Sequence, residues 1–474
     1  MATLLLERSD DPTKMLRPIR IEMILNNIKN QSHSDSNDNK AIGKSSSINL
    51  PNGGGAIRGI SEKFSTNPVS GTASLTVPLP ISVARNFQPD LALSYDSGSG
   101  NSAFGLGWNI NVSSIGRKTD NGLPEYLDYQ DSDTYTLGGA EDLVPYLEAS
   151  NTDWLEKIYT RVLVGKSWEV KLYRPRIESI YSKIERWRDE ESNIIWWRTV
   201  STSNVTTVYG FHEDACIFEP DNRAKTFRWM VDFIYDDKGH LTQYQYKREN
   251  ASGVDFSQAN EQHRLHENFS QLYLKKILYG IKQSRLKSNI YDEDLLSHTF
   301  AVSDFHFQTV FDYGDHADLP NGSVSNEPDI ETWPSRLDAF SNYRAGFEIR
   351  TYRRCQRIML FHDFPELGNQ PALVKALVLQ YDHSTDGFSF LTSIESVGYK
   401  NNASGNVESA RMPKIEYAYQ PHVWNEQLST VDAISLENIP AGVDGQQYQW
   451  LDLYGEGLNG ILTEQKEPCT INKI

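Results

Sequence analysis

The chain has 474 residues, of which 46 are Lys or Arg and 63 are Asp or Glu, so its formal net charge is −17. Apolar residues make up 38% and charged residues 23%, which is the composition of a soluble globular protein of about three domains. No apolar run approaches the roughly 18 residues of a membrane-spanning segment, and the acidic balance argues against broad nucleic-acid binding, which needs a positive surface.

The N-terminus lacks the features of a secretory signal peptide. The apolar run within Met1–Leu6 is too short, and acidic residues follow it closely. Residues 15–29 carry isoleucine and methionine at partly helical spacing, which predicts one amphipathic helix. Residues 30–47 are almost entirely polar and are predicted to form a flexible linker. Gly43-Lys44-Ser45 ends like a phosphate-binding loop, but Asp38 stands where that motif needs its first glycine.

From residue 50 onward the sequence changes to short strands separated by turn residues. Aromatic and β-branched residues alternate with Gly, Asn, Asp and Ser at intervals of about ten residues. This rhythm predicts an all-β domain with a large antiparallel sheet over 48–425. The clearest predicted strands are 73–79, 91–95, 168–173, 194–200, 207–212, 227–235, 243–247, 305–313, 347–352, 358–362 and 376–381. Segment 269–279 is ambiguous, with a strand favoured at its end.

Two turn signals predict hairpins within this sheet. Asp236 and Gly239 supply the first turn, and Tyr244 and Tyr246 then face one side of the returning strand. A looser version begins at Tyr381-Asp382 and contains Gly387.

The glycine-rich segment 98–107 precedes Trp108. Its glycines permit positive φ and close backbone approach. One interpretation is a turn that lets a neighbouring layer pack on Trp108, and the other is an ordinary loop.

Several ordered motifs in the strand-rich segment resemble one known family. They are Gly53–Ile57 (GGGAI), Gly71–Ser82 (GTASLTVPLPIS), Leu91–Asn101 (LALSYDSGSGN), Phe104–Trp108 (FGLGW), Tyr173–Arg176 (YRPR), Phe311–Gly314 (FDYG), Phe340–Arg350 (FSNYRAGFEIR), Arg353–Gln356 (RRCQ) and Leu360–His362 (LFH). Over roughly 50–422 the chain resembles the N-terminal domain of the Salmonella virulence plasmid B protein (SpvB). The same domain opens the B subunits (TcB, TcaC-like) of bacterial insecticidal Tc toxin complexes.

The resemblance also extends to two segments that are similar to later parts of Tc toxin subunits. The Tyr-Asp hairpin at 235–242 is similar to one unit of the RHS repeats that follow this domain in Tc toxins. Residues 447–462 look like the first repeat of the β-propeller in the full B subunit. We therefore expect an extension over 1–47, one helix plus a polar linker, and a truncated start of a propeller-like middle domain over 426–474. A chain of this form is expected to be incomplete as a functional unit.

In SpvB the resembling domain precedes an actin-modifying ADP-ribosyltransferase. That enzyme class needs an Arg, a Ser-Thr-Ser strand and a Glu-x-Glu loop. Ser201-Thr202-Ser203 is present, but no Glu-x-Glu occurs in the sequence. The resemblance therefore implies a chain that is not an enzyme.

Some residue patterns imitate metal or nucleophile sites. His263 and His266 beside Glu261 have a spacing that can bind zinc, but a solvated loop is favoured because neither a Cys nor a third His lies nearby. Gly100–Phe104 misses the last glycine of a nucleophile elbow and indicates a tight turn. Asp452, Glu456 and Gly457 imitate a calcium loop, in which Tyr454 occupies a position that needs an oxygen ligand.

Other patterns concern carboxylates and thiols. Asp189-Glu190-Glu191 lies near Trp187, Trp196 and Trp197, a pattern that can bind sugars but is better explained by an acidic turn between strands. Cys216, Cys355 and Cys469 are too far apart for a CxxC motif and are interpreted as isolated thiols. Arg353 and Arg354 could lower the pKa of Cys355, although a strand with alternating faces is favoured. We assign no catalytic, cofactor-binding or metal residue and no cofactor.

The expected function is that of a non-enzymatic toxin-complex component, which helps to form the shell that encloses and delivers a toxic polypeptide. Alternatives are a secreted effector or adhesin-like binding module, or a carrier for a separately encoded ADP-ribosyltransferase. Expected partners are RHS-type or Tc-type subunits, or a second copy of the chain, because a cut shell exposes sheet edges. The expected location is extracellular, without a signal peptide, or the bacterial cytoplasm before release.

Overall fold

The computed structural model divides the chain into two compact units, Met1–Pro421 and His422–Ile474. It describes residues 63–66, 72–419 except 140, 151–152, 179–180, 265–266, 268, 329–332, 384–386 and 403, and then 448–451, 460–463 and 470–472. The predicted helix over 15–29 and the predicted linker over 30–47 lie outside the described residues. Among the described residues, no helix has the length and apolar character needed to cross a membrane.

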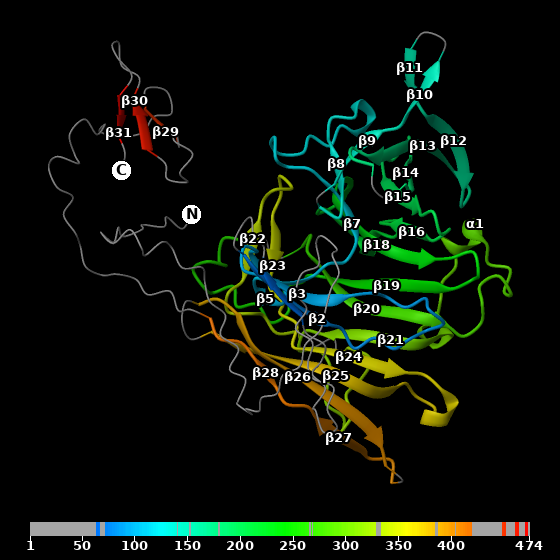
Figure 1. The fold of residues 1–474 in the computed structure, drawn as a ribbon, viewed down its shortest axis with the longest axis vertical. Helices are drawn as coiled ribbons and strands as arrows, with labels where there is room; N and C mark the ends of the chain where they lie inside the picture. Colours follow the sequence, from blue (N-terminus) through cyan, green and yellow to red (C-terminus); the bar gives the residue numbers. More distant parts are fainter. Residues whose placement is uncertain are drawn as a thin grey trace, which may run out of the picture. The chain divides into compact units, whose positions relative to one another are not determined.

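Eight strands of the 18-stranded main sheet close into a ring (Figure 1). In order of pairing these are β7 (Ser114–Arg117), β8 (Tyr135–Leu137), β9 (Glu141–Pro145), β13 (Lys166–Pro175), β14 (Lys183–Arg188), β15 (Ile195–Val200), β16 (Thr206–Tyr209) and β18 (Asn222–Tyr235). Strand β18 closes the ring because its two halves pair with different strands. Tyr235 pairs with Thr206 of β16, and Trp229 pairs with Ile115 of β7.

The same sheet continues from β18 as an open antiparallel array, drawn in green, yellow and orange in Figure 1. Its strands are β19 (Leu241–Arg248), β20 (Leu272–Ile281), β21 (Phe305–Asp312), β24 (Arg357–His362), β25 (Ala372–Asp382), β26 (Phe390–Asn401), β27 (Val407–Arg411) and β28 (Ile415–Glu416). The turn between β18 and β19 is the predicted hairpin, in which Gly239 has φ +88 and Tyr235 pairs with Leu241.

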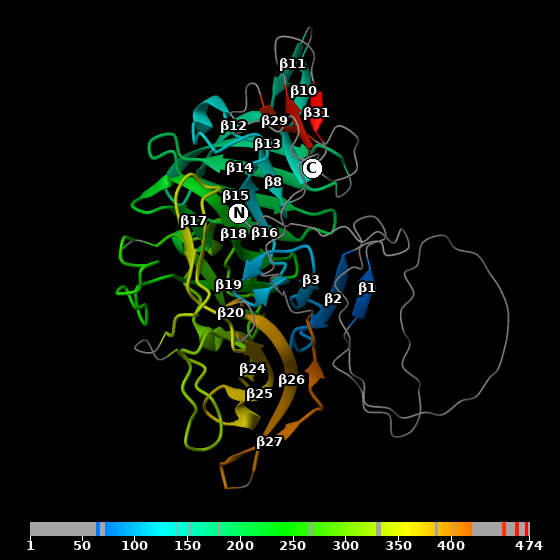
Figure 2. The same ribbon diagram turned by 90° about the vertical axis from the view of Figure 1, so that its left-hand side faces the viewer.

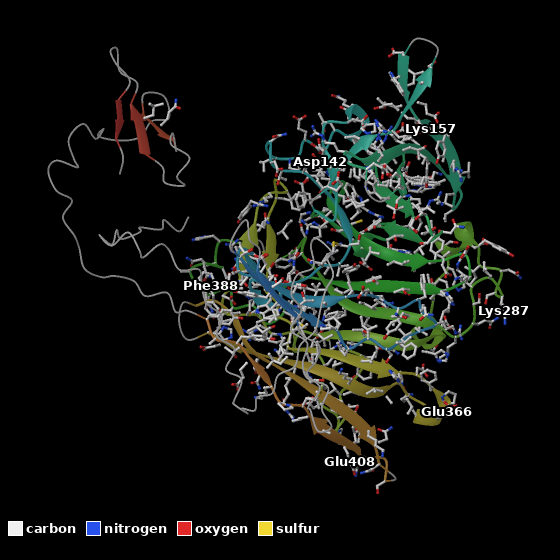
Figure 3. The ribbon with its side chains drawn as sticks, in the orientation of Figure 1. Asp142, Lys157, Lys287, Glu366, Phe388 and Glu408 are labelled. Atoms are coloured by element: carbon white, nitrogen blue, oxygen red, sulfur yellow. The ribbon has the colours of Figure 1, made fainter. Side chains whose placement is uncertain are left out.

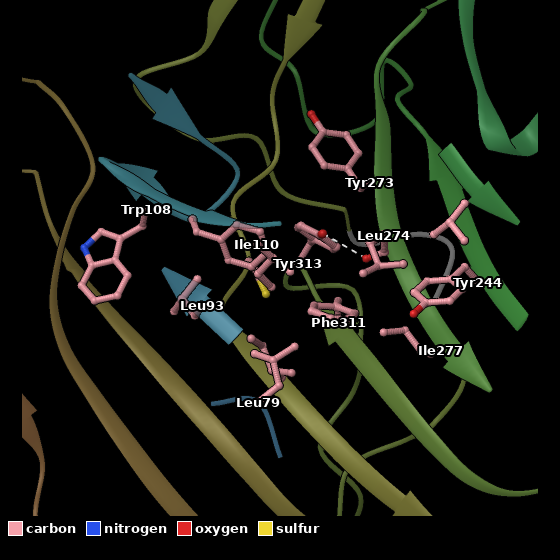
Figure 4. Packing of buried hydrophobic residues seen from close by; sticks show 14 of the residues in the cluster. Leu79, Leu93, Trp108, Ile110, Tyr244, Tyr273, Leu274, Ile277, Phe311 and Tyr313 are labelled. Atoms are coloured by element: carbon pink, nitrogen blue, oxygen red, sulfur yellow. Dashed lines mark hydrogen bonds between the residues drawn. The ribbon is translucent and has the colours of Figure 1, made fainter. Parts of the chain in front are cut away.

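A small second sheet packs on the main sheet. It contains β1 (Lys63–Thr66), β2 (Ala73–Pro78), β3 (Ala92–Asp96) and β6 (Trp108–Ile110). Figure 4 shows Leu93 and Trp108 from this sheet and Phe311 and Ile277 from the main sheet, which belong to the same buried cluster. Burial of these side chains and their neighbours in one continuous core supplies the main driving force for the fold.

Shorter elements complete the first unit. They are the pairs β4 (Asn101–Ser102) with β5 (Gly105–Leu106), β10 (Leu147–Ser150) with β11 (Asp153–Glu156) and β22 (Phe340–Asn342) with β23 (Ile349–Thr351), the strands β12 (Ile158–Leu163) and β17 (Cys216–Glu219), and helix α1 (Asp292–Leu295). In the second unit, β29 (Tyr448–Leu451), β30 (Gly460–Thr463) and β31 (Thr470–Asn472) form a three-stranded antiparallel sheet. That this sheet begins a propeller stays a prediction.

The all-β prediction is confirmed, and most predicted strands are present. Two of them are shorter than predicted by two or more residues. The strand predicted over 207–212 ends at Tyr209 because Gly210 takes φ +61, and the strand predicted over 347–352 contains only Ile349–Thr351. The ambiguous segment 269–279 contains β20, a buried strand in the middle of the sheet. The strand predicted through Arg353 and Cys355 is wrong, since β24 begins at Arg357.

The glycine-rich segment before Trp108 forms a close contact between layers. Trp108 is buried and donates its indole N–H to the Tyr419 hydroxyl at 2.8 Å. Gly105 has φ +92, and a Cβ there would lie 2.6 Å from the carbonyl oxygen of Ser389. The interpretation in which a neighbouring layer packs on Trp108 therefore describes this turn.

Replacing Gly105 with alanine is expected to destabilise the fold more than the same change at Gly346. Both glycines have positive φ, so each variant loses about 1–2 kcal/mol from backbone strain. Only Gly105→Ala also forces a contact with Ser389, which adds about 1–3 kcal/mol, whereas Gly346 has open space around it. Urea denaturation measures both, and equal losses in the two variants would contradict the close packing.

Candidate partner interface

Exposed large apolar side chains gather in one short stretch of the described chain. They are Tyr146, Leu147, Trp154, Leu155, Ile158, Val162 and Val164, which we call the hairpin surface. Trp154 is 66% exposed and Val162 is 70% exposed, although both belong to strands. A concentration of exposed apolar side chains in one region is typical of an interaction surface.

The hairpin β10–β11 extends away from β12 and β13, as Figures 1 and 2 both show. Its paired residues alternate between two faces, so Trp154 with Ala149 lies on one face and Leu155 with Glu148 lies on the other. Both faces are exposed. An isolated two-stranded hairpin is only marginally stable in water, so this one is suited to being covered by another layer.

Strand β12 offers a free edge beside the hairpin. Within the described residues it pairs only with β13, which leaves the backbone groups of its other edge available. Ile158 and Val162 are exposed on one face, while Leu163 is buried on the other. Lys157, labelled in Figure 3, joins the hairpin to β12 and forms an ion pair with Glu148.

A buried carboxylate anchors β12 to the ring. Glu185 accepts a hydrogen bond from the Tyr159 hydroxyl at 2.6 Å and forms ion pairs with Arg198 and Lys183, each at 2.6 Å. Burial alone would raise the pKa of Glu185, but the Arg198 guanidinium and the hydrogen bonds lower the pKa to about 2. The edge strand is therefore held to β14 and β15 by a charged network.

This network predicts a pH dependence of stability that Glu185→Gln removes. The pKa of Glu185 falls from its ordinary 4.5 to about 2 on folding, so its contribution is present above pH 4.5 and is lost as the pH falls toward 2. The difference in unfolding free energy between wild type and variant should shrink by about 3 kcal/mol across that window. Urea denaturation at pH 6, 4.5 and 3 measures the trend, and a constant difference would contradict it.

The residues considered for metal or nucleophile chemistry, where the structure describes them, are engaged within the fold or exposed to solvent. Glu261 is buried and is engaged by Arg350 and by the Tyr352 hydroxyl, while His263 is exposed and His266 lies outside the described residues. No group of three or more potential metal ligands occurs in the described part of the chain. Ser102 lies in the β4–β5 turn and accepts a hydrogen bond from the Phe104 N–H at 2.9 Å.

The remaining candidates are also parts of the scaffold. Asp189 accepts hydrogen bonds from Ser192 and from the backbone N–H of Glu191 in the turn between β14 and β15. Trp187 and Trp196 beside it are buried and stack at 4.7 Å, so they present no surface to a sugar. Burial raises the pKa of the Cys355 thiol, which makes this thiol unreactive. The calcium-like residues 452–457 lie outside the described residues.

Sequence reasoning missed the hairpin surface. Residues 146–164 alternate apolar and charged residues as other strands do, and the sequence does not say which strands remain uncovered. The available signal was Trp154 and Leu155 directly after the polar segment Ser150–Asp153, which is typical of a hairpin tip.

Comparison with known proteins identifies the family. The SpvB family, described as Salmonella virulence plasmid 65kDa B protein, matches residues 67–364. The chain belongs to the SpvB family. The mono(ADP-ribosyl)transferases SpvB of Salmonella typhimurium and Salmonella dublin are 33% identical to it over 338 residues, which are 71% of this chain and 54% of those proteins. The chain therefore spans about half the length of these curated relatives.

The similar solved structures are of two kinds, an SpvB N-terminal domain and Tc toxin complexes. The N-terminal domain of effector protein SpvB from Salmonella typhimurium is 32% identical, with a TM-score of 0.61, over 69% of this chain and 98% of that domain. A crystal structure of TcdB2-TccC3 is 31% identical, with a TM-score of 0.72, over 90% of this chain and 20% of the matched chain. The structure of the Photorhabdus luminescens Tc holotoxin pore is also similar, with a TM-score of 0.69 and 30% identity.

Proposed function

We propose that this SpvB-family chain is a non-enzymatic wall component of a toxin complex and assembles with a Tc-type subunit. The observation that supports it best is the extent of the structural likeness. The similarity to TcdB2-TccC3 covers 90% of the chain, while the similarity to the SpvB N-terminal domain covers 69%. A long sheet that is half closed and half open suits a wall that encloses a polypeptide.

The proposal that the chain is not an enzyme is supported by which part of SpvB it matches. The chain covers 98% of the solved SpvB N-terminal domain but only 54% of the transferase proteins. The transferase activity named for those relatives is therefore assigned to the part of SpvB that this chain does not match.

Purified chain should neither hydrolyse NAD nor label actin, and turnover abolished by a single carboxylate substitution would contradict the proposal.

The hairpin surface is proposed to contact the partner subunit. Aromatic and aliphatic side chains at the centre of an interface carry most of its binding energy, and Trp154 is the largest one exposed here. A free edge on β12 can also accept a strand from another chain. The complex is proposed to act outside the bacterium after release from its cytoplasm.

The interface test compares two variants with a partner subunit such as TccC3. The double variant Trp154→Ala, Leu155→Ala should weaken binding in isothermal titration calorimetry by at least about tenfold. Leu337→Ala is the matched control, because Leu337 is 81% exposed and lies outside the hairpin surface. Equal affinities for both variants and wild type would remove the hairpin surface from the interface.

A second candidate function is a carrier for a separately encoded ADP-ribosyltransferase, which the naming of the curated relatives favours. A transferase gene beside the gene for this chain would support the carrier. A gene for an RHS-type shell in that position would support the wall component.

A further inference from the structure

A pocket lies where the ring meets the open half of the main sheet. Its volume is about 430 Å³, which is within the range of small-ligand sites. One wall comes from β7 and β18 of the ring, another from β20, and the hairpin β22–β23 contributes Phe340 and Thr351. Tyr273 and Leu274 of β20, which Figure 4 labels, belong both to the lining of the pocket and to the buried core.

The lining of this pocket has an unusual charge for such an acidic chain. The sequence has 63 Asp and Glu, yet no carboxylate is among the residues that line the pocket, while two arginines are. Arg117 is already neutralised, because its guanidinium pairs with Asp128 and Asp133, each at 2.6 Å. The guanidinium of the other arginine, Arg228, makes neither an ion pair nor a hydrogen bond with any residue that the structure describes, and it lies 5.8 Å from the centre of the Phe227 ring.

The position of Arg228 keeps its guanidinium available to a ligand. Arg228 is an exposed residue of β18, so its guanidinium is accessible to water through the pocket that it lines. An arginine stays protonated, and Arg344 adds a second positive charge nearby. The cross-strand partner of Arg228 is Gly116, and a Cβ there would lie 3.6 Å from the Arg228 Nε. That distance is an ordinary van der Waals contact, so Gly116 borders the guanidinium without crowding it.

The other lining residues indicate which chemical group a ligand would carry beside the one that pairs with Arg228. Beside Arg228 lie the apolar side chains of Ile217, Phe227 and Met230, and Asn111 adds a side-chain amide. A guanidinium binds a carboxylate through two parallel hydrogen bonds, and the apolar wall favours a hydrocarbon or aromatic group attached to it.

We propose that this pocket binds a carboxylate-bearing ligand with an apolar or aromatic body, held by Arg228. The carboxylate can belong to a free small acid or to the C-terminal residue of a peptide, since both present the same group. This site is independent of the partner interface proposed above, because none of its lining residues belongs to the hairpin surface.

The test uses fluorine NMR titration of the full chain with 4-fluorophenylacetate and, in parallel, with its neutral amide. The carboxylate should bind at least about ten times more tightly than the amide, because only the carboxylate pairs with the guanidinium. Arg228→Met should abolish that preference, and Arg228→Lys should retain part of it. Arg161→Met is the matched control, because Arg161 is an exposed arginine on β12 and should leave the preference unchanged.

A second arm uses a tripeptide that ends in phenylalanine, with a free or an amidated C-terminus. Stronger binding of the free peptide than of the small acid would identify a polypeptide end as the source, and binding of the small acid alone would identify a free acid. Thermal melts establish that each variant folds. The comparison of acid with amide uses the wild-type chain and does not depend on the variants. The proposal is overturned if acids and amides bind the wild type alike, or if Arg228→Met keeps the preference.

Discussion

Replacing Arg353 with methionine is expected to lower the free energy of unfolding by about 3–5 kcal/mol. Arg353 is fully buried, and its Nε donates to Glu249 at 2.6 Å. Its other guanidinium nitrogens donate to the backbone carbonyls of Asn250 and Ser252, at 2.6 and 2.7 Å, and of Trp333. Burial already raises the pKa of Glu249, so the variant would leave an uncompensated carboxylate in the core.

A double variant separates the effect of the unpaired Glu249 charge from the effect of lost packing. Arg353→Met combined with Glu249→Gln should recover part of the stability, because the glutamine carries no charge and still accepts hydrogen bonds from Tyr273 and the Tyr352 N–H. Urea denaturation of both variants measures the recovery. A loss below about 1 kcal/mol for Arg353→Met alone would contradict the role of this ion pair.

Replacing Trp197 with alanine is expected to cost about 3–5 kcal/mol through the cavity left inside the ring. Trp197 is fully buried, and its ring lies 4.9 Å from Tyr135, 5.1 Å from Tyr173 and 6.0 Å from Trp229. These four aromatic residues come from β8, β13, β15 and β18, so their packing holds together strands on different sides of the ring.

Trp154→Ala provides the matched control for Trp197→Ala. Trp154 is exposed on the hairpin surface, so its removal from the free chain should change the unfolding free energy by less than about 0.5 kcal/mol. Chemical denaturation followed by circular dichroism measures both variants. Similar losses for the two tryptophans would show that the interior of the ring is not tightly packed.

The strands were predictable from sequence, whereas the closure of the ring was not. Trp196 and Trp197 indicate a strand, because aromatic residues favour the pleated backbone. Their adjacency places them on opposite faces, and both faces are covered. Which strands cover them depends on pairings such as Arg228 with Gly116, which join residues far apart in the sequence and leave no local pattern.

The candidate surfaces were harder to predict for the same reason. Glu261 beside two histidines has the residue types of a zinc site, but its partner Arg350 lies 89 residues away. The lining of the pocket around Arg228 contains no carboxylate, and its residues come from many separate strands. Exposure of Trp154 and Val162 depends on which layers the fold leaves uncovered. Local sequence patterns specify residue types and strand positions, and these features arise only after distant strands pair.

The most direct test of the proposed function is assembly with a Tc-type subunit. Equal amounts of the purified chain and of TccC3, which is present in the matching crystal structure, would be mixed and passed through size-exclusion chromatography with multi-angle light scattering. We expect a single species with the summed mass of the two chains, together with loss of the two separate peaks. Two unchanged peaks at the masses of the separate proteins would contradict it.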